Sequence, residues 1–162
     1  MRLNRKLERI LAGARENVNC KCILLAEDNP ADVYLIREAL ATEGAADEIE
    51  LAVVSDGEQA IDYLLHRGAF AGAARPDLVI LDLNLPKSDG IDVLRLARGQ
   101  AELANVPILV LTSSDSPADR TVTQNLGANS FITKPSDLDA FMALGGTLLS
   151  YVRPKSSARS TT

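Results

Sequence analysis

The chain has 162 residues and a mass of 17.3 kDa, with 46% hydrophobic, 24% charged and 4% aromatic residues. That composition is typical of one globular domain with an aliphatic core, and it excludes an intrinsically disordered chain. The formal net charge of −5 argues against nucleic acid as a partner, because phosphate binding requires a basic face.

Residues 1–19 form an amphipathic N-terminal stretch. Its apolar side chains recur at helical spacing, at Leu3, Leu7, Ile10, Leu11 and Ala14. We interpret it either as an extra helix that docks on the domain or on a partner chain, or as a helix-prone tail. It lacks the apolar segment of a secretory signal, and no run in the chain approaches the ~20 apolar residues of a membrane span. We therefore expect a cytoplasmic protein without membrane contact.

Cys20 and Cys22 follow this stretch as a Cys-x-Cys pair. A zinc site requires about four ligands, and the chain has no second cysteine pair and a single histidine. The pair is therefore predicted to be two reduced thiols near the start of a strand.

Short aliphatic runs then alternate with amphipathic stretches, a pattern that predicts repeated βα units around a parallel sheet. The expected strands cover 22–26, 50–54, 78–81, 106–111 and 130–132. The expected helices cover 31–42, 57–66, 91–98, 117–126 and 138–152, the last one weakened by Gly145 and Gly146. We predict one domain over 20–153 and a disordered, Ser/Thr/Arg-rich tail over 154–162.

Polar side chains follow four of the predicted strands. Glu27 and Asp28 follow the first strand and Asp82 the third, while Thr112 and Lys134 lie at the ends of the fourth and fifth. The site of a doubly wound sheet lies outside the carboxyl ends of its strands, so these residues are expected to converge. Taken singly, Asp28, Asp82, Thr112 or Lys134 would more often be a helix cap, a turn residue or a solvated loop residue. Their joint occurrence at separate strand ends favours a functional site.

Three converging carboxylates require neutralisation. Two like charges ~4 Å apart repel by about 4 kcal/mol at an effective dielectric near 20. Lys134 can offset one charge, and ligation by oxygen alone selects Mg²⁺, or Mn²⁺, for the rest. One carboxylate is then free to act as a nucleophile and form an aspartyl-phosphate.

Four strings carry a resemblance to a known family: ILLAEDNPAD (23–32), DLVILDLNLPKSDGIDVL (77–94), VPILVLTSSD (106–115) and FITKP (131–135). Over about residues 20–152, the chain resembles the receiver domain of two-component response regulators. The resemblance implies a flavodoxin-like α/β fold, with a doubly wound five-stranded parallel sheet in the order 2-1-3-4-5 and helices on both faces. It also implies phosphotransfer from a phosphohistidine on a sensor histidine kinase.

The resemblance implies the chemical roles of the residues at the strand ends. Asp82 matches the phosphoacceptor and Lys134 the phosphate-binding lysine. Asp28 matches the direct carboxylate ligand of Mg²⁺, and Glu27 the neighbouring acid that acts through a metal-bound water. Asn84 lies where the family supplies a metal ligand from its backbone carbonyl.

Three further residues match positions that respond to phosphorylation or shape the loop. Thr112 and Phe131 match the switch hydroxyl and the switch aromatic, and Pro135 matches a proline that usually follows a cis bond. In related proteins the switch alters the face of the fourth helix, fifth strand and last helix. Homodimerisation through that face, or through the N-terminal extension, is a hypothesis.

Only one helix and the tail follow Pro135, so we expect the output to be a changed protein contact.

The strings EDNPAD and LDLNLPKSDG are most similar to small regulators that partner phytochrome-type kinases, which suggests a bacteriophytochrome partner. Two alternatives are an unphosphorylated scaffold and a phosphoaspartyl phosphatase. Such hydrolases place a second acid two residues after the nucleophile, where this chain has Asn84. We thus predict a signalling module that catalyses only its own phosphorylation and dephosphorylation.

Overall fold

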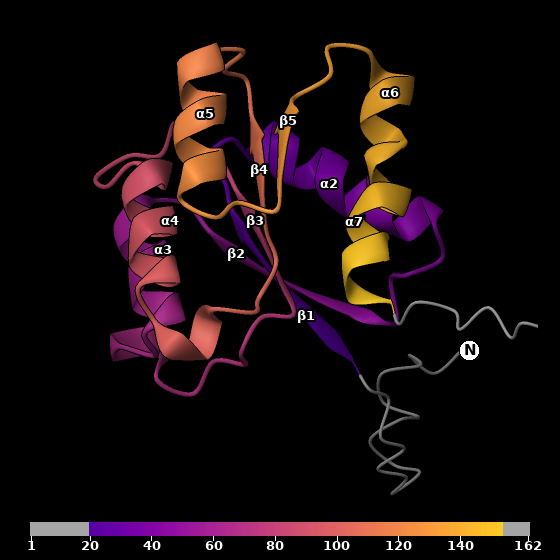
Figure 1. The fold of residues 1–162 in the computed structure, drawn as a ribbon. Helices are drawn as coiled ribbons and strands as arrows, with labels where there is room; N and C mark the ends of the chain where they lie inside the picture. Colours follow the sequence, from indigo (N-terminus) through magenta and orange to yellow (C-terminus); the bar gives the residue numbers. More distant parts are fainter. Residues whose placement is uncertain (1–19, 154–162) are drawn as a thin grey trace, which may run out of the picture.

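The structure is a computed structural model that describes residues 20–153, and it contains one five-stranded parallel sheet (Figure 1). The strand order is β2-β1-β3-β4-β5, as predicted. The strands are β1 (Lys21–Ala26), β2 (Ile49–Val54), β3 (Leu78–Leu81), β4 (Ile108–Thr112) and β5 (Ser130–Thr133). The helices are α2 (Pro30–Thr42), α3 (Gly57–Leu64), α4 (Gly90–Arg98), α5 (Pro117–Asn125), α6 (Leu138–Met142) and α7 (Leu144–Val152). Two 3₁₀ turns, η1 (Gly68–Phe70) and η2 (Ala101–Leu103), lie in the loops.

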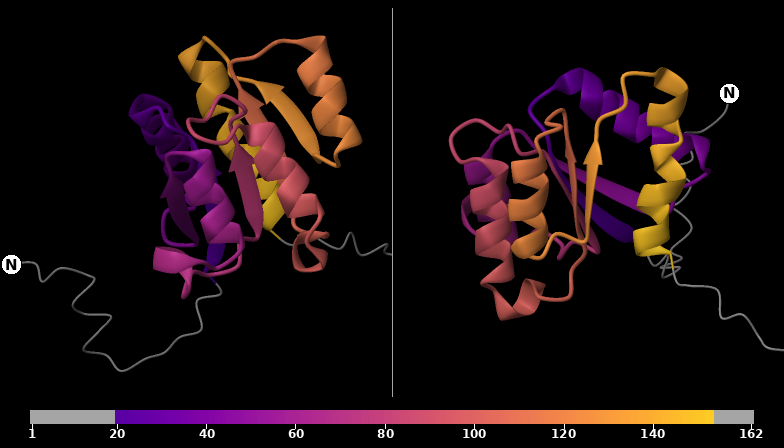
Figure 2. Two further views of the ribbon diagram at one scale, coloured as in Figure 1. Left: turned by 90° about the vertical axis from the view of Figure 1, so that its left-hand side faces the viewer. Right: turned by 45° about the horizontal axis from the view of Figure 1, so that its top comes forward.

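Helices cover both faces of the sheet. Figures 1 and 2 show α3, α4 and α5 on one face and α2, α6 and α7 on the other. Alternate strand residues point to opposite faces, so each strand contributes to two cores. In β1, Ile23 and Leu25 pack toward α2 and α7, whereas Leu24 and Ala26 pack toward α3 and α4. Burial on both faces explains why the central strands are continuous aliphatic runs in the sequence.

The predicted elements agree with the structure to within about two residues at each end, apart from the last helix. The predicted helix over 138–152 is two helices, separated at Ala143. The glycine at 145 allows a close approach at this point, because a Cβ there would overlap the backbone carbonyl of Ala39 in α2. A helix pair packed this closely favours a local break near its glycines.

The backbone hydrogen bonds between neighbouring strands continue one residue past the ends of β1 and β3, and they hold the acids that follow these strands at one edge of the sheet. The Glu27 amide donates to the Val54 carbonyl at 3.0 Å, and the Asp82 amide donates to the Ala26 carbonyl at 3.1 Å. These bonds fix the backbone of both acids as firmly as that of the strand residues before them.

Capping residues then turn the chain into each helix. The side chains of Asn29, Asp56, Asp89, Ser116 and Asp137 each accept a hydrogen bond from a backbone amide in the first helical turn. These five polar side chains are therefore structural, and none of them is a candidate site residue.

Among residues 20–153, no helix is long and apolar enough to cross a membrane. The predicted amphipathic extension over 1–19 and the predicted tail over 154–162 lie outside the described residues.

Candidate functional site

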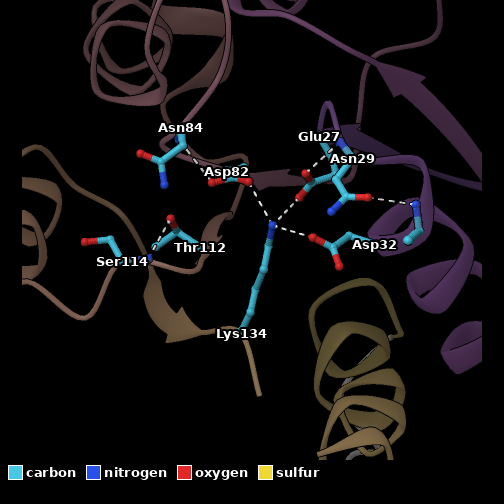
Figure 3. Close-up of polar contacts among 9 residues, drawn as sticks. Glu27, Asn29, Asp32, Asp82, Asn84, Thr112, Ser114 and Lys134 are labelled. Atoms are coloured by element: carbon cyan, nitrogen blue, oxygen red, sulfur yellow. Dashed lines mark hydrogen bonds and ion pairs between the residues drawn. The ribbon is translucent and has the colours of Figure 1, made fainter. Parts of the chain in front are cut away.

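Four strands bring the predicted site residues together at their carboxyl ends. Glu27 and Asp82 directly follow β1 and β3, Thr112 ends β4, and Lys134 directly follows β5 (Figure 3). The Lys134 amide donates to the Thr112 carbonyl at 2.7 Å, which extends the β4–β5 ladder to the lysine. The predicted convergence at this edge is what the structure shows.

Lys134 is the centre of the cluster. Its Nζ donates to Glu27 Oε2 at 2.7 Å, to Asp82 Oδ2 at 2.8 Å and to Asp32 Oδ2 at 2.8 Å (Figure 3). The lysine side chain is only 10% exposed, and those of Glu27 and Asp82 are 2% and 5% exposed. Three donors on one ammonium thus reach three carboxylates without competing for a hydrogen.

Asp32 is a member of this cluster that the sequence reasoning missed. It lies in the first turn of α2, whose N-cap Asn29 and first residue Pro30 direct the helix away from the end of β1. A residue in that first turn projects back toward the strand ends. Its position within EDNPAD was visible in the sequence, but an acid in a first helical turn is also a common response to the helix dipole.

Backbone amides orient the two buried acids. The Asn29 amide donates to Glu27 Oε1 at 3.1 Å, and the Asn84 amide donates to Asp82 Oδ1 at 3.1 Å. Each acid thus has one oxygen on an amide two residues later and the other oxygen on Lys134. Fixed in this way, neither carboxylate can rotate freely.

The loop after Asp82 returns close to it. The Gly90 amide donates to the Leu83 carbonyl at 3.0 Å, and a Cβ at this glycine would overlap the Asp82 carbonyl oxygen. Only glycine allows the start of α4 to pack directly behind the acid.

Burial and hydrogen bonding act in opposite directions on the pKa values of the site. Burial raises the pKa of Glu27 to about 7, because it outweighs the hydrogen bond from Lys134. Burial acts the same way on Asp82, but the bonds from Lys134 and the Asn84 amide outweigh it and lower the pKa. Burial would lower the pKa of Lys134, and its carboxylate partners instead hold it above its usual value. At neutral pH Asp82 is therefore an ionised carboxylate beside a charged ammonium.

The cluster has the donor set of a divalent cation site. Oxygens of Glu27, Asp28 and Asp82 all lie within 4.8 Å of one another. Asp28 is exposed while the other two acids are buried, so the group opens to solvent on one side. Hard oxygen ligands with an open side fit Mg²⁺ or Mn²⁺, which keep part of their water shell. The expected role of the Asn84 carbonyl as a ligand stays a prediction.

Thr112 and Phe131 lie on neighbouring strands. Thr112 is fully buried, and its Oγ1 accepts a 3.3 Å hydrogen bond from the Ser114 amide. Phe131 lies in β5, half-buried, with the Arg120 guanidinium 4.6 Å from its ring centroid. Arg120 also donates to the Phe131 carbonyl at 3.3 Å. The switch roles of Thr112 and Phe131 remain predictions.

The described residues contain no cis peptide bond, so the bond before Pro135 is trans. The predicted cis bond is wrong. The trans isomer is intrinsically favoured by about 0.5–1 kcal/mol in X–Pro bonds. A cis bond would be expected in a tight turn, but residues 134–137 pass from β5 to α6 without a hydrogen-bonded turn. Nothing local therefore offsets the trans preference.

Comparisons of the sequence with known proteins point to one family. The family model "Response regulator receiver domain" matches residues 23–144. "Response regulator Rcp1" of Synechocystis sp. (strain ATCC 27184 / PCC 6803 / Kazusa) is 38% identical over 127 residues, which cover 78% of this chain and 85% of the relative.

Two solved structures extend the likeness. That of the phosphorylated cyanobacterial phytochrome response regulator RcpA has 40% identity and a TM-score of 0.76, over 85% of this chain and 99% of that chain. The Mn²⁺-bound form of response regulator Rcp1 has 34% identity and a TM-score of 0.77, over 85% and 97%.

Proposed function

The chain belongs to the response regulator receiver domain family, and from this premise we propose that Asp82 accepts a phosphoryl group from a sensor histidine kinase. The protein is a receiver-domain signalling protein. We propose further that its own phosphorylation and dephosphorylation are the only reactions it catalyses.

The position of Asp82 carries the proposal. It is an ionised carboxylate at the end of the central strand β3, with its Oδ2 2.8 Å from the Lys134 ammonium and its Oδ1 on the Asn84 amide. A carboxylate fixed beside a cation is prepared to attack an electrophilic phosphorus, because charge neutralisation and positioning supply most of the catalysis in phosphoryl transfer.

In the transfer step, a carboxylate oxygen of Asp82 forms a bond to the phosphorus of a phosphohistidine. The phosphorus–nitrogen bond of the donor breaks, and its electron pair stays on the imidazole nitrogen, which takes up a proton from solvent. Lys134 can move from Asp82 Oδ2 to a phosphoryl oxygen, and the Thr112 hydroxyl can donate to another. In hydrolysis, a water oxygen bonds to the phosphorus and the bond between the phosphorus and the Asp82 oxygen breaks. The electron pair stays on the Asp82 carboxylate, inorganic phosphate leaves, and the proton of the water passes to solvent.

Glu27, Asp28 and Asp82 would hold Mg²⁺, or Mn²⁺, as the cofactor. When bound, the cation neutralises charge on the carboxylates and on the phosphoryl oxygens. The Mn²⁺-bound form of the relative Rcp1 supports this assignment.

A phytochrome-type histidine kinase is the partner that the relatives favour, since RcpA is described as a phytochrome response regulator. We propose that phosphorylation draws Thr112 toward the phosphoryl group and lets Phe131 move inward. That movement would change the face formed by α5, β5 and the α6–α7 pair. The same face is a candidate surface for a homodimer.

Intact-mass measurement after incubation with acetyl phosphate and Mg²⁺ tests the proposal. We expect a gain of about 80 Da, the mass of one phosphoryl group, that disappears in Asp82→Asn and with a chelator. Asp139→Asn, an exposed acid of α6, is the matched control and should keep the adduct. A missing adduct alone could reflect rapid hydrolysis, and binding of beryllofluoride with Mg²⁺ tests for that. If wild type gains no mass and beryllofluoride also fails to bind, the phosphoacceptor role is wrong and a scaffold is favoured.

A further inference from the structure

An apolar groove lies between α2 and β2, away from the phosphorylation site. It has a volume of about 210 Å³ and is lined mainly by Arg37, Leu40, Ala41, Ala46, Ile49 and Leu51. Ile49 pairs with Lys21 at the start of β1, whereas the acidic cluster follows the other end of that strand. The groove therefore belongs to the opposite half of the domain.

The apolar surface continues beyond the groove. β2 is an edge strand, and its residues Ile49, Leu51 and Val53 share one face by strand alternation. Val53 is 38% exposed, and Tyr34, two helical turns before Ala41 on α2, is 60% exposed. These two are half of the four large hydrophobic residues that the described part of the chain exposes. Exposed apolar side chains on the two elements that form a groove are typical of an interaction surface.

The chain enters the fold directly beside this groove. Cys20 is the first described residue and is exposed, and the next amide, that of Lys21, donates to the Glu48 carbonyl at 2.9 Å. Residues 15–19 can span up to ~17 Å when extended, so residue 14 can lie anywhere along the groove. A segment that precedes Cys20 thus needs no long connection to reach Ile49.

Residues 1–19 have the side chains that such a groove would take. An apolar stripe recurs at helical spacing along them, at Leu3, Leu7, Ile10, Leu11 and Ala14. A helix over 3–14 would be ~18 Å long, against the ~13 Å from Ile49 to Val53 along β2. A short amphipathic helix is marginal alone and is stabilised by packing its apolar face.

The charges of the two parts are complementary. Residues 1–19 contain five basic and two acidic side chains, a net charge of +3. The stretch 43–50, which borders the groove, contains four acidic side chains and no basic one. All four acids are exposed. Glu48 already pairs with Arg153, whose Nη2 lies 3.4 Å from Glu48 Oε2, so Glu43, Asp47 and Glu50 are the acids left for a docked segment. A basic segment is therefore attracted to this rim, and an acidic segment is repelled.

We propose that residues 1–19 dock as an amphipathic helix in the α2–β2 groove of their own domain. Its apolar stripe then covers Ile49, Leu51 and Val53, and its basic side chains face the acidic rim of 43–50. The occupant is the same chain because the segment emerges beside the groove, so its effective concentration there is far above that of a second copy.

Photo-crosslinking in the full-length chain tests this. p-Benzoylphenylalanine replaces Leu7, the protein is irradiated, and the crosslinked tryptic peptides are identified by mass spectrometry. We expect crosslinks to residues 34–53 in a species of monomer mass. Crosslinked dimers would show that the segment docks on a second copy, and crosslinks elsewhere or none would show that the groove is not its site. Either result overturns the proposal.

Two α2 substitutions provide the matched comparison. Ala41→Lys puts a long charged side chain on the groove lining and should lower the crosslink yield roughly tenfold, because a docked apolar stripe would have to desolvate that charge. Thr42→Lys adds the same charge at the next, exposed residue, outside the lining, and should leave the yield unchanged. Leu11→Asp disrupts the stripe without touching the described fold and should also abolish the crosslink. Equal yields in all three variants would refute docking in the groove.

Discussion

At the scale of single residues, Lys134 is the group on which the cluster depends. Its ammonium contacts the carboxylates of Glu27, Asp32 and Asp82. With Asp28, which lies beside two of these acids, the cluster has four carboxylates and one ammonium, a formal charge of −3 when all are ionised. An incoming phosphoryl group must compete with three of these acids for Lys134. Asp32 is neither the proposed nucleophile nor a proposed metal ligand, so its effect on the reaction can be separated from theirs.

We predict that Asp32→Asn accelerates phosphorylation by acetyl phosphate several-fold. The substitution removes one negative charge and one competitor for the lysine, which favours binding of a phosphoryl dianion. The measurement is the rate of mass gain at saturating Mg²⁺, with Asp139→Asn as the control for loss of an exposed acid that makes no contact with Lys134. A slower rate than wild type would show instead that Asp32 holds Lys134 in its working position.

The sequence predicted the participants on four strands but not Asp32 or the isomer of Pro135. The predicted residues follow short aliphatic runs, and topology alone places the ends of parallel strands together. Asp32 depends on where a helical turn points its side chain, and an acid in a first turn has several explanations. The isomer of the bond before Pro135 depends on the path of one loop. The resemblance gives the isomer that is usual in the family, and it does not give the path of this loop.

At the scale of elements, the α2–α7 contact sets how the last part of the chain packs. A Cβ at residue 145 would overlap the Ala39 carbonyl oxygen and lie 2.8 Å from the Ala39 carbonyl carbon. At Gly146 the nearest atom would be 3.8 Å away, at the tip of the Glu43 side chain. The sequence showed two glycines that weaken a helix, and it did not show that only one of them is needed for packing.

We predict opposite effects for alanine at these two positions. Gly145→Ala should lower the free energy of unfolding by about 1–3 kcal/mol, because backbone must move to admit the methyl group. Gly146→Ala should raise it by up to about 1 kcal/mol, because alanine favours the helix and meets no obstacle. Urea denaturation followed by circular dichroism gives both values. Equal changes at the two positions would mean that α7 does not pack on α2 this closely.

At the scale of the whole molecule, the strand order places an unbalanced charge at one end of an otherwise well-packed sheet. β3 and β1 are central, and the acids that follow them, Asp82 and Glu27, are nearly inaccessible to solvent. Burying them on one lysine leaves repulsion that disfavours the folded state. A fold that carries this repulsion should be stabilised by whatever neutralises it.

We therefore predict that Mg²⁺ raises the thermal unfolding midpoint. A ligand that binds only the folded state at 100 times its dissociation constant adds about 2.7 kcal/mol. For a chain of this length that corresponds to roughly 5–10 °C. Differential scanning calorimetry measures the shift, a chelator should reverse it, and NaCl at equal ionic strength should not reproduce it. Asp28→Asn should lose the shift while its metal-free midpoint stays equal or rises, because an exposed ligand and one repulsive charge are removed. A full Mg²⁺ response in that variant would show that the cation binds elsewhere and that Lys134 alone neutralises the acidic cluster.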